Sequence, residues 1–209
     1  EKIDVNGEEV KRPECKFDEN NISIKINGEK IETKKNIFLL LNKPKGYISA
    51  TESKSQQTVL DLMPQKYKHR SLFPAGRLDK DTTGLMLITD DGEFAHNILS
   101  PRKHVQKEYE VTIDIPVTSE MAEGFKKGVS LNDGECKTAH LEITGEYTAN
   151  VTITEGRYHQ IKRMFGCFGA KVLELNRIRI GNLYLPKDLK LGEVKEATKD
   201  ELQKIQERN

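Results

Sequence analysis

The densest group of side chains able to do chemistry lies in one short segment, residues 76–84, with the sequence Gly-Arg-Leu-Asp-Lys-Asp-Thr-Thr-Gly. Turn-forming residues bracket the segment and apolar runs flank it, which predicts a loop held between two strands. Rigid flanking strands position such loops well for catalysis. If the loop is extended at Arg77–Asp79, the side chains of Arg77 and Asp79 share a face, so the guanidinium can orient the carboxylate or bind a phosphate.

Two other interpretations of this loop stay open from the residues alone. The spacing of its aspartates, with Asp90 eleven residues after Asp79, resembles a calcium-binding loop. That motif needs a helix on each side, whereas the apolar run after Gly84 indicates a strand. Alternatively, the Asp and Thr side chains serve only to cap backbone amides.

A second group of candidate residues lies on a predicted helix at 158–168. Its expected apolar face comprises Tyr158, Ile161, Phe165 and Phe168. Opposite that face, Lys162 and Arg163 follow His159 by three and four residues, so the three side chains lie close together. They form either a solvated basic surface or a cationic wall beside a negatively charged site.

A third candidate is Tyr109, on a predicted strand at 107–113. A lone tyrosine on a strand belongs to the core or an edge more often than to a catalytic site.

The net charge of +1, from 34 basic and 33 acidic side chains, hides an uneven distribution. Residues 155–180 contain six Lys/Arg and two Asp/Glu, and further basic clusters occur at 66–70 and 102–107. Lysine and arginine patches of this kind bind phosphate backbones. The distribution therefore favours nucleic acid as a partner, although any single cluster is also compatible with a solvated face.

Several classes of protein are disfavoured. No apolar run approaches the ~20 residues that span a bilayer, so no membrane association is expected. Cys15, Cys136 and Cys167 form no paired spacing and the five histidines no ligand pair, so we expect reduced thiols, a cytoplasmic protein and no metal site. The chain begins with Glu rather than Met, which we interpret as a missing front part of its first module.

The elements that must position these residues follow from periodicity and turn signals. Strands are expected at 22–26, 29–31, 37–42, 47–49, 72–75, 85–89, 107–113, 137–143, 151–155, 172–180 and 183–185. Helices are expected from a cap at Thr89 or Asp90 to Leu99, at 119–127, at 158–168, and after the capping box Thr198–Glu201. Strands outnumber helices without regular alternation, so the fold class is α+β.

Five motifs occur in order along the chain. They are Leu41-Asn-Lys-Pro-Lys-Gly46, Phe73-Pro-Ala-Gly-Arg-Leu-Asp-Lys-Asp-Thr-Thr-Gly-Leu85, Thr89-Asp-Asp-Gly92, Lys107-Glu-Tyr109 and Glu155-Gly-Arg-Tyr-His-Gln-Ile-Lys-Arg-Met164. Jointly they resemble the RsuA-type pseudouridine synthases, from residue 37 to about residue 198.

This resemblance implies a pseudouridine synthase fold, a mixed and mostly antiparallel sheet with flanking helices, for a catalytic domain at residues 37–209. Residues 1–34, with the hairpin Ile3-Asp-Val-Asn-Gly7, are similar to the C-terminal part of the small S4-like RNA-binding module that precedes this domain.

The implied activity is isomerisation of a specific uridine in ribosomal RNA, for which we favour 16S over 23S ribosomal RNA. The partner is then ribosomal RNA or a subunit assembly intermediate. No metal or cofactor is expected, and a monomer is the default. The alternative from another class is a non-catalytic RNA-binding ribosome-assembly factor.

The resemblance also assigns residues to roles. The essential aspartate falls on Asp79, and the basic residue that pairs with this aspartate falls on Lys162. The tyrosine that packs on the flipped base falls on Tyr109, and a hydrophobic base contact falls on Leu175. Three roles stay open for Asp79: attack on the uracil ring, attack on the anomeric carbon, or removal of a ribose proton. RNA contacts are expected from Arg77, Lys43, Lys45, Arg102, Lys103, Lys107, Arg157, His159 and Arg163.

Overall fold

A computed structural model describes all residues except 1, 18–21, 32–34, 101–102, 104 and 208–209. The chain forms two compact units, Glu1–Ile37 and Phe38–Asn209. The small unit is an antiparallel sheet in the order β2-β1-β3-β4. Its strands are β1 (Ile3–Val5), β2 (Glu8–Glu9), β3 (Ile24–Ile26) and β4 (Glu29–Ile31).

Both Asn-Gly dipeptides of the small unit, at 6–7 and 27–28, form hairpin turns, as the predicted hairpin at 3–7 and the strands predicted at 22–26 and 29–31 require. Both residues of each turn have positive φ, at 54° and 92° for Asn6 and Gly7 and at 51° and 88° for Asn27 and Gly28. Positive φ at both central positions matches the right-handed twist of the flanking strands, and asparagine and glycine are the residues that adopt it most readily.

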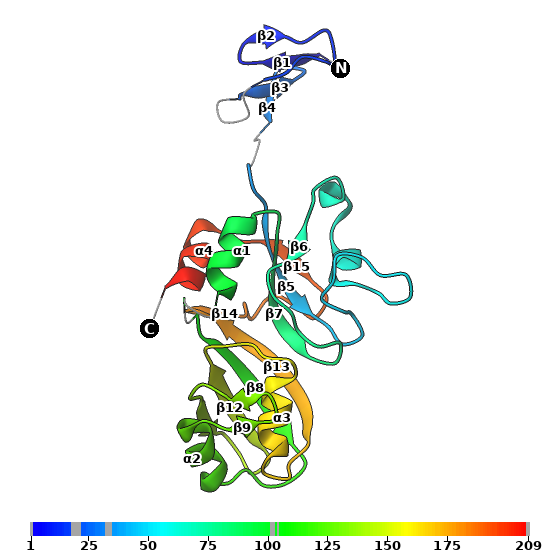
Figure 1. Ribbon diagram of the computed structural model, residues 1–209. Coiled ribbons are helices and arrows are strands. Elements are labelled where there is room, and N and C mark those ends of the chain that lie inside the picture. Colours follow the sequence, from blue (N-terminus) through cyan, green and yellow to red (C-terminus); the bar gives the residue numbers. More distant parts are fainter. Residues whose placement is uncertain (1, 18–21, 32–34, 101–102, 104, 208–209) are drawn as a thin grey trace. The chain divides into compact units, whose positions relative to one another are not determined.

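The large unit is built on a nine-stranded sheet whose main path runs β11-β12-β8-β13-β7-β5-β15, with β14 paired to β13 and β6 to β7 (Figure 1). Its strands are β5 (Phe38–Lys43), β6 (Phe73–Pro74), β7 (Thr83–Thr89), β8 (Lys107–Ile113), β11 (His140–Ile143), β12 (Thr148–Ile153), β13 (Val172–Ile180), β14 (Leu183–Tyr184) and β15 (Val194–Glu196). The other elements are the 3-10 turns η2 (Val59–Leu62) and η3 (Gln65–Tyr67), the hairpin β9 (Ser130–Leu131) and β10 (Gly134–Glu135), and the helices α1 (Gly92–Leu99), α2 (Ser119–Lys127), α3 (Gln160–Gly166) and α4 (Lys199–Gln206).

Except for β13 and β7, the paired strands of this sheet are antiparallel. The predicted class, a mostly antiparallel mixed sheet with flanking helices, is confirmed. No helix in the described part of the chain has the length and apolar character needed to cross a bilayer.

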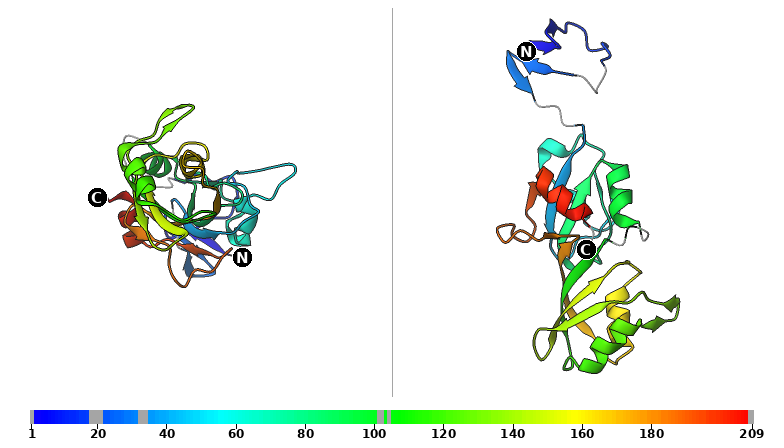
Figure 2. Two further views of the ribbon diagram at one scale, coloured as in Figure 1. Left: turned by 90° about the horizontal axis from the view of Figure 1, so that it is seen from below. Right: turned by 90° about the vertical axis from the view of Figure 1, so that its left-hand side faces the viewer.

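One half of the sheet is organised around β7 and β5. Leu85–Ile88 are fully buried on the strand predicted at 85–89, which lies inside the sheet between β13 and β5. The core on this half joins Leu40 and Leu87 of the strands to Ile98 of α1 and Ile205 of α4. These two helices therefore lie together over the β5–β7 half (Figures 1 and 2).

The other half of the sheet, β11-β12-β8-β13, has α2 and α3 packed beside it. The ring of Phe125 on α2 lies 4.9 Å from that of Phe165 on α3, measured between centroids, and 6.1 Å from that of Phe168. Phe125 and Phe165 are both fully buried. This aromatic cluster holds α3 in place, and α3 carries Lys162.

The two halves meet at the parallel pairing of β7 with β13. It comprises two residue pairs, Thr83 with Asn176 and Gly84 with Arg177. Gly84 has a φ of +105°, and a Cβ at this position would lie 2.3 Å from the backbone oxygen of Arg177. Only glycine fits this close approach of the two backbones.

Most element predictions are confirmed, with differences at several ends. The structure reproduces the predicted bounds at Lys107–Ile113, Ser119–Lys127 and Val172–Ile180. The strand predicted at 47–49 is reduced to one isolated bridge, between Ile48 and Thr58. The strand predicted at 137–143 starts only at His140.

The predicted cap of α1 is wrong. Its N-cap is Asp91, whose side chain accepts a hydrogen bond from the Phe94 N–H at 2.9 Å. Thr89 cannot take this role because it is the last residue of β7 and accepts from the Asp91 N–H. The capping box at Thr198 and Glu201 is present as predicted.

Candidate active site

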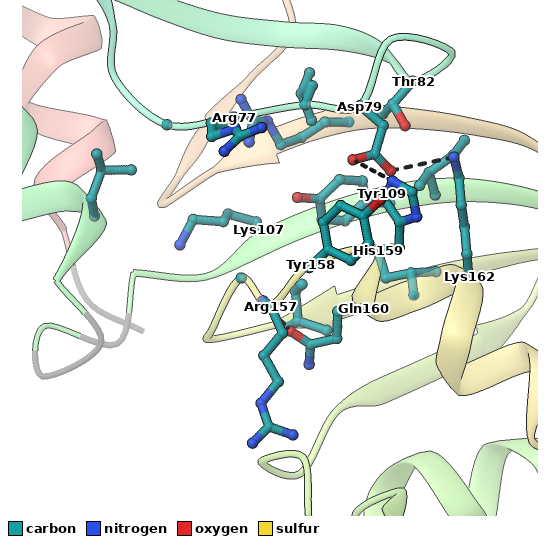
Figure 3. Close-up of a pocket in the computed structure, with 18 residues that line it drawn as sticks. Arg77, Asp79, Thr82, Lys107, Tyr109, Arg157, Tyr158, His159, Gln160 and Lys162 are labelled. Atoms are coloured by element: carbon teal, nitrogen blue, oxygen red, sulfur yellow. Dashed lines mark hydrogen bonds and ion pairs between the residues drawn. The ribbon is translucent and has the colours of Figure 1, made fainter. Parts of the chain in front are cut away.

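A cavity of about 460 Å³ opens where the two halves of the sheet meet. Its lining includes residues 76–79 and 82 of the loop, the cavity-facing side chains of β8 and β13, and the start of α3 (Figure 3). Asp79 is the only carboxylate among the described residues of the lining. Arg77, Lys107, Arg157, Lys162 and Arg177 also line it, so the cavity is strongly cationic.

The loop that carries Asp79 is anchored from below by Lys43. The Lys43 ammonium is fully buried and donates to the carbonyl oxygens of Asp79, Lys80 and Thr82, at 3.0, 3.3 and 2.8 Å. Burial lowers the pKa of this lysine from 10.5 to about 8, against the opposing charges of Asp81 and Asp79. Lys43 was predicted to contact RNA; in the structure it instead positions the loop, because its ammonium is used by backbone carbonyls.

Ser49 adds a second anchor to the loop. Its hydroxyl accepts from the Leu78 N–H at 2.9 Å and donates to the Leu78 carbonyl at 2.7 Å. The Gly46 N–H donates to the Lys80 carbonyl at 2.8 Å. The segment 43–49 therefore fixes the backbone on both sides of Asp79.

The Asp79 carboxylate lies against two cationic or ionisable side chains from the start of α3. Lys162 Nζ is 3.3 Å from one carboxylate oxygen and His159 Nε2 is 3.4 Å from the other (Figure 3). The predicted pairing of Lys162 with the loop aspartate is thus present in the geometry. About a quarter of the Asp79 side chain is exposed, so the group is held in place yet open to the cavity.

Lys162 also binds Asp81, a contact that the sequence did not predict. Its ammonium lies 2.7 and 2.8 Å from the two Asp81 carboxylate oxygens. Burial opposes the charged form of Lys162, but the hydrogen bond with Asp81 and the charge of Asp79 raise its pKa above the ordinary value. The spacing of two between Asp79 and Asp81, together with the predicted basic helix, was the available signal for this bridge.

The face of the sheet towards the cavity is set by strand register. Lys107 and Tyr109 are two apart on β8 and therefore point to the same side. Arg177 of β13 is directly opposite Tyr109, and Leu175, two residues before it, shares that side. All four side chains line the cavity. Tyr109 is 7% exposed, so its ring forms a well-packed wall.

The start of α3 departs from the predicted helix. His159 has a left-handed φ of 47° and the helix begins only at Gln160. Tyr158, predicted on the apolar face, is instead 73% exposed and stacks on the His159 ring at 3.8 Å between centroids. The buried place is taken by Gln160, whose side chain accepts from the Arg157 N–H and donates to Glu155. The left-handed residue interrupts the helical period, and this produces the difference.

The predicted cationic wall of His159, Lys162 and Arg163 is divided between two sites, and Arg157, predicted as an RNA contact, lies at the second of them. Arg163 pairs with Asp133 in the β9–β10 turn, and Arg157 donates to the carbonyl of Gly134, the first residue of β10, at 2.8 Å. These contacts tie the hairpin to the end of β12 and to α3. Neither guanidinium joins Lys162 at Asp79.

Two other predicted RNA contacts, Lys45 and Lys103, are absent from the lining of the cavity. Lys45 pairs with Glu174 on β13. Lys103 is exposed and lines a separate small pocket with residues of α1. Arg102 falls outside the described residues.

The geometry differs from the calcium alternative. The loop is flanked by the strands β6 and β7 rather than by helices. Asp90 pairs with Arg70 at 2.5 Å instead of turning to the loop. Asp79 and Asp81 share Lys162, so a lysine occupies the place that a cation would need.

Lys107 is a partly buried lysine whose pKa is lowered from 10.5 to about 8, by burial and by the charge of Arg177. A lysine whose folded pKa is depressed costs stability below that value, and the cost fades as the pH rises from about 8 towards 10.5. The full pKa shift corresponds to a stability cost of roughly 3 kcal/mol for burying the charged lysine. The hydrogen bond from its ammonium to the Val105 carbonyl offsets about 1 kcal/mol of this cost.

We therefore expect Lys107→Met to raise the melting temperature at pH 7 by several degrees, at roughly 2–4 °C per kcal/mol. Calorimetry at pH 7, 8.5 and 9.5 should show this gain shrinking step by step. A gain that is constant or grows with pH would contradict the assignment of a depressed pKa.

The comparisons with known proteins agree with one another. A profile of the RNA pseudouridylate synthase family matches residues 37–166. An uncharacterized RNA pseudouridine synthase of Bacillus subtilis (strain 168) is 39% identical over 97% of this chain and 87% of its own length. The ribosomal small subunit pseudouridine synthase A of Escherichia coli (strain K12) is 45% identical over 170 residues, 80% of this chain and 73% of its own.

A solved structure described as a pseudouridylate synthase superposes with a TM-score of 0.78 at 36% identity, covering 97% of this chain and 88% of that one. The segment matched by the family profile, residues 37–166, contains the loop with Asp79, the strand β8 with Tyr109 and the helix α3 with Lys162. The chain belongs to the RNA pseudouridine synthase family, as an RsuA-type enzyme.

Proposed function

We propose that this enzyme converts one uridine of 16S ribosomal RNA to pseudouridine, with Asp79 as the essential carboxylate. The observation that carries the proposal is the cavity itself. Asp79, the single carboxylate among its described lining residues, pairs with Lys162 of α3. The nearly buried side chains of Tyr109 and Leu175 line the same cavity. A negative group, a basic partner and an aromatic wall are the parts that the reaction requires.

The target base has to leave its helix before it can enter such a cavity. Extrusion of a paired base costs a few kcal/mol. Stacking on an aromatic ring returns about 1–3 kcal/mol per base, and we assign that part to the ring of Tyr109. Leu175, 8% exposed on the neighbouring strand, supplies an apolar contact to the same base.

The isomerisation exchanges one bond for another without a change in composition. The bond from N1 of uracil to the ribose breaks, the ring turns within the cavity, and the ribose carbon bonds to C5. The C5 proton leaves and N1 gains a proton, so atoms and electrons balance without an oxidant or reductant. Asp79 acts at the reacting centre, while Lys162 and His159 fix the position of its carboxylate.

The choice of 16S ribosomal RNA is supported by the Escherichia coli relative, whose name assigns it to the small ribosomal subunit. We further propose that residues 1–34 are the C-terminal part of an S4-like RNA-binding module. The four-stranded sheet with two tight hairpins in that segment supports the proposal. We also propose that the enzyme acts as a monomer and that its substrate is ribosomal RNA in an assembly intermediate of the subunit.

Mapping of pseudouridines in ribosomal RNA from a strain that lacks this protein tests the proposal. We expect one 16S position to change from pseudouridine to uridine, and the purified enzyme to restore it on RNA or subunit intermediates from that strain. Loss of a 23S position instead would move the target to the large subunit. Unchanged maps of both RNAs would favour the non-catalytic assembly factor.

Two variants of Tyr109 separate the roles of its ring and its hydroxyl. Tyr109→Leu removes the ring face and is expected to weaken binding of the target RNA about tenfold. Tyr109→Phe keeps the ring, so it should bind target RNA within twofold of wild type. It should react about 10²-fold more slowly, because we assign to the Tyr109 hydroxyl the transfer of the proton that leaves C5. Binding titrations and single-turnover rates measure both. Wild-type affinity in Tyr109→Leu would contradict the stacking role.

A further inference from the structure

The cationic lining of the cavity is not fully used by the contacts around Asp79. Lys162 is occupied by Asp79 and Asp81, and Arg157 by the β9–β10 turn. Among the described residues, no carboxylate pairs with Arg77, Lys107 or Arg177, which line the same cavity. Three positive charges therefore border the space without a negative partner.

Arg177 is the most unusual of the three. It is 3% exposed, and its Nε donates to the Leu85 carbonyl at 2.7 Å. Its Nη2 is buried and has no hydrogen-bond partner within the described structure. A buried guanidinium nitrogen left without an acceptor carries a substantial desolvation cost, and such groups are rare in native proteins unless they serve a function.

Lys107 lies beside Arg177 in the same environment. Its ammonium donates to the Val105 carbonyl at 3.0 Å, which leaves further donor capacity on a group with three N–H bonds. The neighbouring positive charge of Arg177 disfavours its charged form, and no described carboxylate compensates. An anion placed here would relieve both the repulsion and the burial cost.

The arrangement of the three residues separates them from the Asp79 cluster. Lys107 and Arg177 flank Tyr109, one along β8 and the other across from it on β13. Arg77 precedes Asp79 by two residues and is exposed. Figure 3 shows Arg77 and Lys107 on the side of the cavity away from Lys162. A nucleotide whose base rests on Tyr109 and faces Asp79 would bring its backbone to this side.

We propose that Arg77, Lys107 and Arg177 form a phosphate subsite that holds one phosphodiester next to the uridine entering the cavity. The inference rests on the proposed function, and it assigns to these residues a role distinct from general attraction of RNA. Lys107 and Arg77 contact the phosphate, and Arg177 supports it by its buried charge. The subsite would fix the ribose relative to Asp79 while the base is free to turn.

A methylphosphonate scan tests the subsite. In RNA fragments carrying the mapped uridine, each phosphate near it is replaced in turn by a neutral methylphosphonate. For wild type, we expect one phosphate next to the uridine to weaken binding about tenfold when neutralised, as the loss of a charge-assisted contact predicts. In Lys107→Met, the unmodified fragment should already bind about tenfold more weakly, and the same methylphosphonate should cost clearly less than in wild type, because only Arg77 still contacts the phosphate.

Matched variants control for folding and for general charge. Lys126→Met removes an exposed lysine of α2 and should keep the wild-type scan. Lys107→Arg retains the charge and should restore the penalty at the same phosphate. An equal penalty in wild type and Lys107→Met would overturn the subsite, as would a scan in which no adjacent phosphate stands out.

Two further measurements complete the test. Binding of inorganic phosphate distinguishes a site for a free phosphate ion from a site for an RNA phosphate, and the salt dependence of RNA binding distinguishes failure of the subsite from failure of the proposed function. If inorganic phosphate at millimolar concentration binds wild type but not Lys107→Met, while the scan is flat, the site takes a free ion and the RNA proposal fails. If wild type forms no pseudouridine in ribosomal RNA, the proposed function fails. The salt dependence of single-stranded RNA binding then still decides the subsite. The slope of the logarithm of the binding constant against the logarithm of the salt concentration should be smaller by about 0.7 in Lys107→Met and unchanged in Lys126→Met. An unchanged slope in Lys107→Met would refute the subsite.

Discussion

Asp79→Asn is expected to abolish pseudouridine formation while RNA binding stays within about threefold of wild type. Asparagine has nearly the same shape and keeps an oxygen for Lys162, but its amide is neither a nucleophile nor a base. The loss in single-turnover rate should be at least about 10³-fold, near the upper range for loss of a catalytic group. Affinity depends on the cationic lining and on the aromatic wall, which the substitution leaves in place.

Asp81→Asn is the matched control for this result. Asp81 also binds Lys162, at 2.7 Å, but 68% of its side chain is exposed and it does not line the cavity. We expect a rate reduction of less than about tenfold, since Lys162 keeps its contact with Asp79. Full activity of Asp79→Asn, with the substitution verified by mass spectrometry, would remove Asp79 from the reaction.

Gly84→Ala is expected to have the largest effect on stability. The φ of +105° disfavours alanine, and its Cβ would lie 2.3 Å from the Arg177 oxygen and 2.6 Å from the Arg177 nitrogen. Backbone strain and the steric clash together should cost about 3 kcal/mol or more. The β7–β13 pairing would have to separate, so activity should fall further than the loss of folded protein explains.

Gly92→Ala provides the comparison for Gly84→Ala. Gly92 is the first residue of α1, lacks a positive φ, and would place its Cβ in open space. Alanine there should leave the melting temperature unchanged or slightly higher. Denaturant titration and the activity of both variants measure the contrast. A Gly84→Ala protein as stable as Gly92→Ala would contradict the tight approach of the two strands.

The parts predicted correctly from the sequence are those decided by local signals. Lys107–Ile113 alternates in polarity as a half-buried strand does, and Ser119–Lys127 ends at Gly128, as a helix with a glycine stop should. The two Asn-Gly turns need only the two residues themselves. In each case the physical cause lies within a few residues of its effect.

The parts that were missed depend on residues far apart in the chain. Nothing next to Lys43 indicates that its ammonium is buried under carbonyls 36 to 39 positions away. The bridge from Lys162 to Asp81 spans 81 positions. Tyr158 was misplaced for a different reason: a single left-handed residue, His159, resets the helical phase, and periodicity assumes a constant phase.

The short parallel pairing of β7 with β13 has a consequence for how the enzyme can be inactivated. Asp79 lies in the loop between β6 and β7, on one side of that pairing, whereas Tyr109 on β8 and Lys162 on α3 belong to the other side. The hydrophobic core under α1 and α4 also includes Ile180 of β13 and Leu183 of β14, so the packing continues across the pairing. Separation of the two β7–β13 residue pairs would move Asp79 away from Tyr109 and Lys162, so we expect local opening at this point to stop the reaction at a lower free-energy cost than global unfolding.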